Sequence, residues 1–354
     1  MRILIFGAGV IGSQFAARLH AAGHAVTVLA RGRRLADIRR HGIVVEDWFT
    51  GERTTTAPQV VDALRPEDAY DLVLVIMGKH QTGATLPALA ANRHTPIVAF
   101  LGNNAAGPDE YVAALGRKRV LIGFAGGAGT IEGHVVRGVV VPVGRNMPLG
   151  EAGGPVTARV LRICEMLNAA GLAAMPSAQA DAWLKTHAAL IVPMAGALAM
   201  AGGDLLRLAG TRDALVWLVR ALRENMRALR ALGVPIIPRQ LDLMAHLPEP
   251  LLVAYLGRIL RDPHMAVGFA HAHKAHPEMS HLAGELLTLT AWSGVPAPLM
   301  HGLLAYFDGR EPPLPEGSAD LALDWRDVEA AAGVVLGLTA LVLIIWRLLA
   351  RRRG

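Results

Sequence analysis

The residues with the clearest chemical signature lie near the N-terminus, where glycines recur at the spacing G-x-G-x-x-G. Between a strand and a helix, this spacing lets backbone amides approach a pyrophosphate, which the positive end of the helix also attracts. We therefore predict a dinucleotide-binding site in this turn. Its residues are Gly7, Ala8, Gly9, Val10, Ile11 and Gly12.

The choice of dinucleotide depends on the end of the second strand. An Asp or Glu there binds the ribose 2′-hydroxyl of NAD, whereas an arginine accommodates the 2′-phosphate of NADP. The chain places Arg31 at this point and Arg34 shortly after it, with no acidic residue before Asp37. Because a guanidinium group suits a phosphate, we expect NADP(H) as the cofactor, bound by Arg31 first and Arg34 second.

The glycine turn requires a strand on one side and a helix on the other. Residues 2–6 and 25–29 are apolar runs typical of buried strands, and the apolar spacing within 10–22 predicts a helix between them. Further strands are expected at 43–46, 71–76, 96–101, 119–123, 135–144 and 172–176. Apolar strands that alternate with helices indicate a doubly wound, mostly parallel α/β sheet, so we expect a Rossmann domain over residues 1–176.

After residue 176 the strand-like runs largely disappear and Ala- and Leu-rich helical segments follow. Helices are expected at 178–201, 213–232, 249–262, 278–294 and 297–307. We therefore expect an all-helical second domain over residues 177–311, the part of the chain to which the family resemblance given below assigns substrate binding and catalysis. A Pro-rich stretch then predicts a linker over residues 312–329.

Residues 330–346 are uncharged and apolar. As a helix with a rise of ~1.5 Å per residue they would cover about 26 Å, slightly less than the roughly 30 Å hydrocarbon core of a bilayer. We expect a C-terminal hydrophobic, membrane-associated helix over residues 330–350, with a buried core helix as the alternative. A span would carry Arg351–Arg353 across the membrane, against the positive-inside rule, so a helix lying at anionic headgroups is a second alternative.

Charge and cysteine content narrow the function classes. Four arginines at the C-terminus account for most of the net charge of +6, so the rest of the chain is close to neutral and shows no clustered nucleic-acid footprint. Cys164 is the single cysteine, which excludes an internal disulfide. Four nearby histidines lack a partner that would complete a site, so we expect no metal; they are His271, His273, His276 and His281. The N-terminus has no signal-peptide pattern, and we expect a cytoplasmic enzyme, tethered to a membrane by its C-terminal helix.

With these features in place, the chain resembles the ketopantoate reductase (2-dehydropantoate 2-reductase) family over about residues 1–305. The resemblance depends on GAGVIG at 7–12, Arg31, Asn103 in FLGNNAAG, Trp183-Leu184-Lys185, and HPEMSHLAGELL at 276–287. It implies a Rossmann domain, an all-helical domain of the 6-phosphogluconate-dehydrogenase-like kind, and a substrate cleft between them. It also implies NADPH-dependent reduction of a 2-oxo acid or a related small carbonyl compound.

The resemblance assigns roles to individual residues. Lys185 corresponds to the family's catalytic lysine, and its ammonium would give a proton to the carbonyl oxygen as hydride arrives from the nicotinamide. Glu278 corresponds to the family's glutamate, which helps to hold the cofactor and the lysine. Asn103 corresponds to the asparagine at the cofactor and the substrate, with Asn104 as the alternative. Gly129 falls where the family presents backbone to the cofactor.

The departures from the family concern the substrate. Positions at which the family binds ketopantoate with asparagine or serine are apolar here, namely Ala189, Pro193, Ala266 and Ala283. The family's lysine after the fourth strand is displaced by one position, because Gly78 precedes Lys79. A substrate less polar or larger than ketopantoate is therefore expected, and His187 is either a replacement polar group or a core histidine.

Two other functions remain open at this stage. One is an opine-type dehydrogenase that reduces an imine formed from a keto acid and an amine. The other is a catalytically retired NADP(H)-binding protein that acts as a membrane-associated sensor, which the lost substrate residues favour and the retained Lys185 and Glu278 oppose. A homodimer is an open alternative to a monomer.

Overall fold

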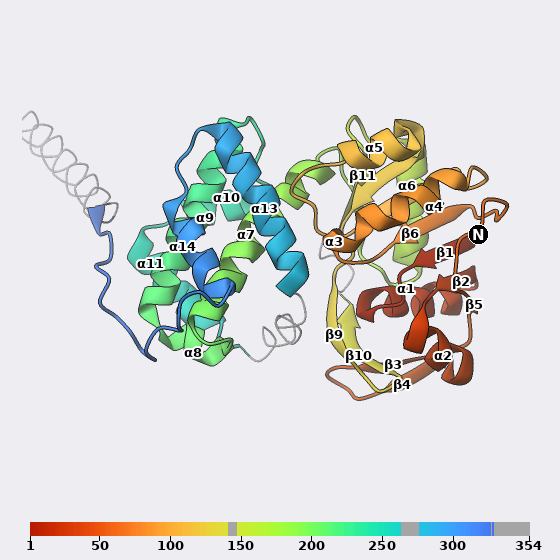
Figure 1. The fold of residues 1–354 in the computed structure, drawn as a ribbon, viewed down its shortest axis with the longest axis horizontal. Coiled ribbons are helices and arrows are strands. Elements are labelled where there is room, and N and C mark those ends of the chain that lie inside the picture. The colour runs from red at the N-terminus through yellow and green to blue at the C-terminus, as the bar shows by residue number, and fades with distance from the viewer. Residues whose placement is uncertain (141–146, 263–275, 327, 329–354) are drawn as a thin grey trace, which may run out of the picture.

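The computed structural model describes residues 1–140, 147–262, 276–326 and 328. Within them an eight-stranded sheet forms the centre of the N-terminal half of the chain (Figure 1). From one edge to the other its strands are β12 (Ala174–Pro176), β11 (Met147–Glu151), β8 (Val120–Gly123), β7 (Val98–Leu101), β6 (Leu72–Val75), β1 (Arg2–Phe6), β2 (Ala25–Leu29) and β5 (Gln59–Val61). All neighbouring pairs are parallel except β8 and β11. The predicted mostly parallel α/β sheet is therefore confirmed.

Alternate residues of the central strands face two separate cores, which explains why these strands are apolar throughout. Ile3 and Ile5 of β1 belong to the core beneath α1 (Val10–Ala21) and α6 (Ala158–Ala169). Leu4 and Phe6 belong to the core beneath α4 (Leu86–Ala91) and α5 (Asp109–Leu115). Because successive side chains of a strand point to opposite faces, a sheet covered on both sides needs apolar residues at every position.

Two of the expected strands belong to a second sheet. Among the described residues this sheet has four strands, in the order β4 (Arg53–Thr56), β3 (Ile43–Asp47), β10 (Val135–Val140) and β9 (Gly127–Glu132). The expectation that 43–46 and 135–144 join the parallel sheet is wrong, because β10 forms a hairpin with β9 and pairs with β3. Helix α1 contacts strands of both sheets. The second sheet thus packs beside the main sheet in the N-terminal half of the chain.

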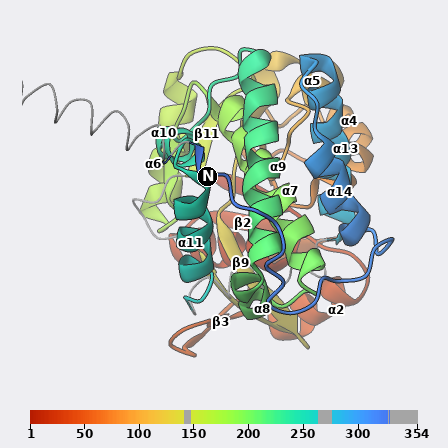
Figure 2. The same ribbon diagram turned by 90° about the vertical axis from the view of Figure 1, so that its left-hand side faces the viewer.

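The second half of the described chain is helical (Figures 1 and 2). Its helices are α7 (Ala180–Met200), α8 (Leu205–Gly210), α9 (Arg212–Ala231), α10 (Arg239–Ala245), α11 (Glu249–Ile259), α13 (His276–Ser293) and α14 (Pro298–Phe307). The five predicted helices are all present, and the short α8 and α10 were not predicted. Helix α7 packs against α9, α13 and α14, so it forms the centre of this domain.

Helix α7 contains Pro193, which the helix accommodates through a contact from its neighbour. A proline has no backbone N–H, so the carbonyl of Ala189 one turn earlier loses its usual donor. The buried Asn225 of α9 replaces it, donating from Nδ2 to the Ala189 oxygen over 3.2 Å. Among the described helices, α7 is long and apolar enough to cross a bilayer, but most of it is buried in the protein, as in a core helix.

The stretch expected to be a linker is held on the helical domain as far as the structure describes it. Asp213 at the start of α9 accepts hydrogen bonds from the Asp320 and Leu321 amides, each at 2.9 Å. The Asp324 amide donates to Glu249 at the start of α11 over 2.9 Å. This segment is therefore part of the helical domain's surface. The expected hydrophobic helix at 330–350 lies outside the described residues.

Candidate functional site

A cleft of about 670 Å³ opens between the sheet and the helical domain. It lies where β1 and β6 are neighbours, the point at which the strand order reverses, beyond the carboxyl ends of these strands. Ligands of open α/β sheets bind at this kind of position. The sheet side contributes Gly9–Gly12, Ile76–Gly78, Leu101–Asn103, Phe124, Ala125 and Gly127–Ile131, and the helical side contributes His187, Ile191, Met194, Ala195, Leu198, Glu278 and Met279.

The glycine turn has the geometry that a phosphate-binding loop needs. Gly7 has φ +121°, and a Cβ there would lie 2.3 Å from the Ile76 oxygen. A Cβ on Gly12 would lie 1.9 Å from the Gly7 oxygen, so only glycine lets α1 approach the strand this closely. A Cβ on Gly9 would meet no protein atom within 4 Å. The backbone at Gly9 therefore faces open space at the N-terminus of α1, where a pyrophosphate could approach.

The two arginines after β2 lie in different surroundings. The Arg34 guanidinium is half-buried and donates to the Ala8 oxygen over 3.1 Å, the Ser13 hydroxyl over 2.9 Å and the His134 oxygen over 3.1 Å. Arg34 therefore braces the glycine turn. Arg31 is exposed at the N-cap of α2 (Gly32–His41), and no hydrogen bond or ion pair engages its side chain within the described residues.

Asn103 and Glu278 meet at the cleft although they come from different domains. Asn103 follows β7, and its Nδ2 donates to Glu278 Oε1 at the start of α13 over 3.0 Å. The Lys79 backbone amide donates to the same oxygen over 3.4 Å. The Asn103 Oδ1 atom is buried without a hydrogen-bond partner among the described residues. The cleft therefore presents acceptor oxygens to whatever binds there.

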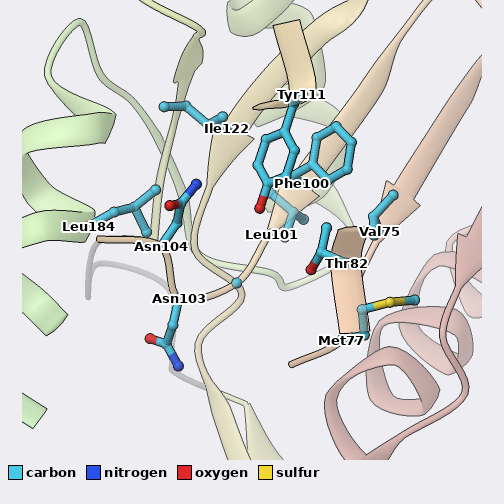
Figure 3. Close-up of a pocket in the computed structure, with 11 residues that line it drawn as sticks. Val75, Met77, Thr82, Phe100, Leu101, Asn103, Asn104, Tyr111, Ile122 and Leu184 are labelled. Carbon is cyan, nitrogen blue, oxygen red and sulfur yellow. The ribbon is translucent and has the colours of Figure 1, made fainter. Parts of the chain in front are cut away.

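The neighbouring Asn104 points away from Asn103, as Figure 3 shows. Its side chain is buried and bonds both the amide and the carbonyl of Gly107, each at 2.9 Å. Asn104 thus shapes the loop after β7, and of the two asparagines only Asn103 lines the large cleft. A separate space of about 10 Å³ lies behind this loop, which is roughly the volume that one water needs.

Lys79 is a buried cation beside the cleft, surrounded by two carboxylates and an aromatic ring. Its Nζ is 3.2 Å from Glu110, 3.6 Å from Glu285 and 4.7 Å from the centre of the Tyr111 ring. Burial opposes the charge of Lys79, but Tyr111, Glu285 and Glu110 together outweigh it and raise the pKa of Lys79. Lys79 therefore stays protonated, and its charge is neutralised by residues of the protein itself.

Glu285 of α13 joins that cluster to the loop after β7. Its Oε2 accepts hydrogen bonds from the Ala105 and Ala106 amides, at 2.8 and 3.1 Å. Its Oε1 is also 3.3 Å from His281 Nε2. Together with Glu278, Glu285 fixes α13 against the sheet, so the two domains share one polar network at the inner end of the cleft.

Lys185 is close to this network but does not line the cleft. It is buried on α7, and its Nζ forms an ion pair with Asp181 one turn earlier. A Cβ added to Gly107 would lie 3.2 Å from Nζ, which places the ammonium behind the loop after β7. The residues of α7 that face the cleft begin with His187, and residues two apart point to different sides of a helix.

His187 lines the cleft inside a group of aromatic rings. Its ring stacks on Trp183 with centroids 4.9 Å apart and lies 4.6 Å from the Phe124 ring. Burial lowers the pKa of His187 to about 4, so the imidazole is neutral at pH 7.

The positions that depart from the family pattern lie in different places. Ala189 and Ala283 are buried in a core of the helical domain, where they contribute to packing. Pro193 is buried within α7, and Ala266 lies outside the described residues. Gly129 lines the cleft in β9 with φ +146°, in a position too close to β10 for a side chain.

Sequence reasoning missed several residues that line or shape the site. Phe124 and Met279 line the cleft, and Glu285 fixes the loop beside it. For Phe124 the available signal was its place directly after β8, at the strand end where ligands bind. Glu285 could have been suspected because it follows Glu278 by two helical turns and these two are the acidic residues of the helix.

Residues 3–140 match the family model described as ketopantoate reductase PanE/ApbA. Among solved structures, the chain is similar to a D-mandelate dehydrogenase in complex with NADH and anilino(oxo)acetate, with a TM-score of 0.71 and 19% identity, over 88% of this chain and 98% of the other. It is also similar to 2-dehydropantoate 2-reductase from Porphyromonas gingivalis W83, with a TM-score of 0.63 and 19% identity, over 85% and 96% of the two chains. The corresponding enzyme from Geobacter metallireducens GS-15 gives a TM-score of 0.68 and 18% identity, over 88% and 100%.

At these identities the solved structures show a common fold, which extends through the helical domain. The match to the family model covers the glycine turn, Arg31 and Asn103. It confirms the resemblance drawn from the sequence motifs. Over residues 3–140 the chain is thus similar to the ketopantoate reductase PanE/ApbA family.

Proposed function

We propose that the protein is an NADPH-dependent reductase of a 2-oxo acid or a related carbonyl compound. The observation that carries this proposal is one cleft whose lining combines two kinds of polar contact. Gly9 contributes open backbone beside the N-terminus of α1, and Asn103 and Glu278 contribute side-chain oxygens. A ligand with both a pyrophosphate and hydroxyl donors matches this lining.

The described residues fit a nicotinamide dinucleotide. Gly9–Gly12 would hold its pyrophosphate, and Arg31 would bind the 2′-phosphate of NADP(H). The unpartnered Oδ1 of Asn103 and the Glu278 carboxylate would accept hydrogen bonds from ribose hydroxyls or from the substrate. When bound, the reduced cofactor would supply hydride to the carbonyl carbon, while the carbonyl oxygen takes a proton and an alcohol is released.

Lys185 is the proposed proton donor. Its ammonium lies beside Gly107, in the loop that begins at Asn103, and Asp181 holds it there. Delivery of the proton requires a shift of this loop or of the lysine side chain when substrate binds. Catalytic hydrogen bonds are often long or incomplete without substrate, so this arrangement is compatible with the role.

The fold neighbours support a 2-oxo acid or its hydroxy acid as substrate. Their names include 2-dehydropantoate 2-reductases and a D-mandelate dehydrogenase bound to NADH. The apolar residues of α7 that line the cleft, Ile191, Met194 and Leu198, favour a substrate less polar than ketopantoate. A catalytically retired NADP(H)-binding protein is the second candidate, because Lys185 does not line the cleft.

Two measurements test the proposal. Fluorescence titration with NADPH and NADH gives the affinity for each cofactor, and a panel of carbonyl compounds is followed by NADPH absorbance at 340 nm. We expect tighter binding of NADPH and oxidation with at least one 2-oxo acid. Binding without oxidation across the whole panel would favour the retired protein, and absence of binding would contradict both candidates.

The remaining expectations stay proposals. Domain boundaries at 1–176 and 177–311, a cytoplasmic location, a membrane tether at 330–350 and a homodimer each need their own experiment. Truncation after residue 329, followed by fractionation of cells, addresses the tether directly.

A further inference from the structure

One face of α7 forms an apolar wall along the cleft. The cleft-lining residues of this helix are His187, Ile191, Met194, Ala195 and Leu198. Their spacing of three and four places them in one stripe. Apart from the neutral His187, every member of the stripe is apolar.

The end of the stripe near His187 is closed by aromatic rings. Phe124, which follows β8 on the opposite side of the cleft, lies 4.6 Å from the His187 ring, and Trp183 stacks on that ring at 4.9 Å. The low pKa of His187 means that this end carries no charge at neutral pH. Among the described residues that line the cleft, Glu278 is the one charged side chain.

This arrangement discriminates between substituents on a carbonyl compound. A hydroxyl or charged group against Ile191 and Met194 would lose its hydration without gaining a partner, which disfavours binding. A flat or branched apolar group would exclude water from the same surface and gain contacts with the rings. The helix wall therefore favours the second kind of substituent.

We propose that Phe124, His187, Ile191 and Met194 form a substituent subsite that selects carbonyl compounds bearing an aryl or similarly bulky apolar group. The inference rests on the proposed reductase function, because the subsite is useful only if a carbonyl group lies next to it. The inference concerns only the group attached to the carbonyl carbon. The test therefore compares substrates that differ in this group and are otherwise identical.

The experiment uses two pairs of substrates, each differing only in the substituent. Phenylglyoxylate is compared with pyruvate, and acetophenone with acetone, with the full-length protein and NADPH. We expect kcat/KM to be at least tenfold higher for the phenyl member of each pair that is turned over, since apolar pockets discriminate by roughly 10–200-fold per small group. Equal values, or a preference for the methyl member, would overturn the inference while leaving the reductase function intact.

Variants of α7 test whether its apolar, cleft-lining residues cause the preference for the phenyl substrates. Ile191→Gln places a polar group in the proposed subsite, and we expect the phenyl-to-methyl ratio to fall about tenfold. The matched control is Leu190→Gln, because Leu190 is its half-buried neighbour but packs against the helical core and does not line the cleft. This control should keep the wild-type ratio. Ala195→Phe, which fills the cleft, should reduce turnover of the phenyl member more than that of the methyl member.

NADPH affinity and thermal unfolding of each variant separate loss of selectivity from loss of folding. If no compound is oxidised, the proposed function fails, and the subsite is then tested by binding alone. In that case the NADPH-loaded protein is titrated with mandelate and with lactate, and fluorescence is recorded. Tighter binding of mandelate, weakened by Ile191→Gln and not by Leu190→Gln, would support the subsite, and equal binding would overturn it.

Discussion

Asn103 Nδ2 donates a hydrogen bond to Glu278 Oε1 over 3.0 Å, joining residues 175 positions apart in the chain. The bond connects the end of β7 with the first turn of α13, so it crosses between the sheet and the helical domain. Glu278 also receives the Lys79 amide. One carboxylate therefore helps to set both the distance between the domains and the polarity of the cleft.

We expect Asn103 and Glu278 to be energetically coupled. Asn103→Ala and Glu278→Ala each remove the hydrogen bond, so the double variant should lose less stability than the sum of the two single variants. Groups in direct contact usually couple by about 0.5–3 kcal/mol. Urea unfolding of the wild type and the three variants measures this coupling, and additive losses would show that the bond contributes nothing.

The glycines of the N-terminal turn should respond differently to alanine. Gly12→Ala places a Cβ against the Gly7 oxygen and should lower both stability and cofactor affinity. Gly9→Ala meets no protein atom, so its unfolding midpoint should stay close to that of the wild type while cofactor affinity falls at least tenfold. Thermal unfolding and NADPH titration distinguish the two. Full affinity in Gly9→Ala would place the pyrophosphate elsewhere.

Local patterns were enough to predict the long helices and six of the eight strands of the main sheet, but not β5 and β11. The run 2–6 and the glycine turn describe contacts between near neighbours in the chain, and the resulting strand, turn and helix are those observed. The second sheet was not predictable in this way. Its β3–β10 pairing joins Val44 to Val135, and neither strand carries a signal for a partner so far away in sequence.

The contacts between polar residues of the site were likewise not predictable from local sequence patterns. Asn103 and Glu278 could be named from the family resemblance, and they lie together as that resemblance implies. The commitment of Lys79 to Glu110 and Glu285 depends on three elements that only the fold brings together. Likewise, the helical spacing of α7 shows that Lys185 and His187 point to different sides, but only the structure shows which side faces the cleft.

Substitution of the two arginines after β2 should have different effects. Loss of Arg31 should change the preference between NADPH and NADH, and loss of Arg34 should disturb the glycine turn. Arg31→Ala removes an exposed guanidinium and should weaken NADPH binding by about 1.5–3 kcal/mol, while NADH binding changes little. Arg34→Ala removes three hydrogen bonds to the glycine turn and its surroundings, so it should weaken both cofactors. Arg33→Ala is the control, because Arg33 pairs with Asp37 at the surface. Equal losses for NADPH and NADH in Arg31→Ala would contradict the NADP assignment.

Substitution of Lys185 should lower kcat, whereas substitution of Lys79 should lower the free energy of unfolding. Lys185→Ala should lower kcat by at least about 10²-fold, the usual contribution of a positioned acid, while NADPH affinity is retained. Lys79→Met leaves the buried Glu285 without its cation and should lower the free energy of unfolding by about 1–3 kcal/mol. Steady-state kinetics and urea unfolding of both variants provide the comparison. An unchanged kcat in Lys185→Ala would remove this residue from the mechanism.

The half-buried imidazole of His187 should make stability depend on pH. Folding lowers the pKa of His187 from 6.5 to about 4 because burial disfavours the charged ring. Between these values the unfolded chain binds a proton that the folded protein does not, so the wild type should lose stability as the pH falls from about 6.5 to about 4. His187→Phe keeps an aromatic ring between Trp183 and Phe124 but has no proton to bind. The difference in unfolding free energy between wild type and variant should therefore change by about 1–3 kcal/mol over this range, measured by urea unfolding at several pH values. A difference that stays constant with pH would mean that His187 titrates normally and that the cleft around it is open to water.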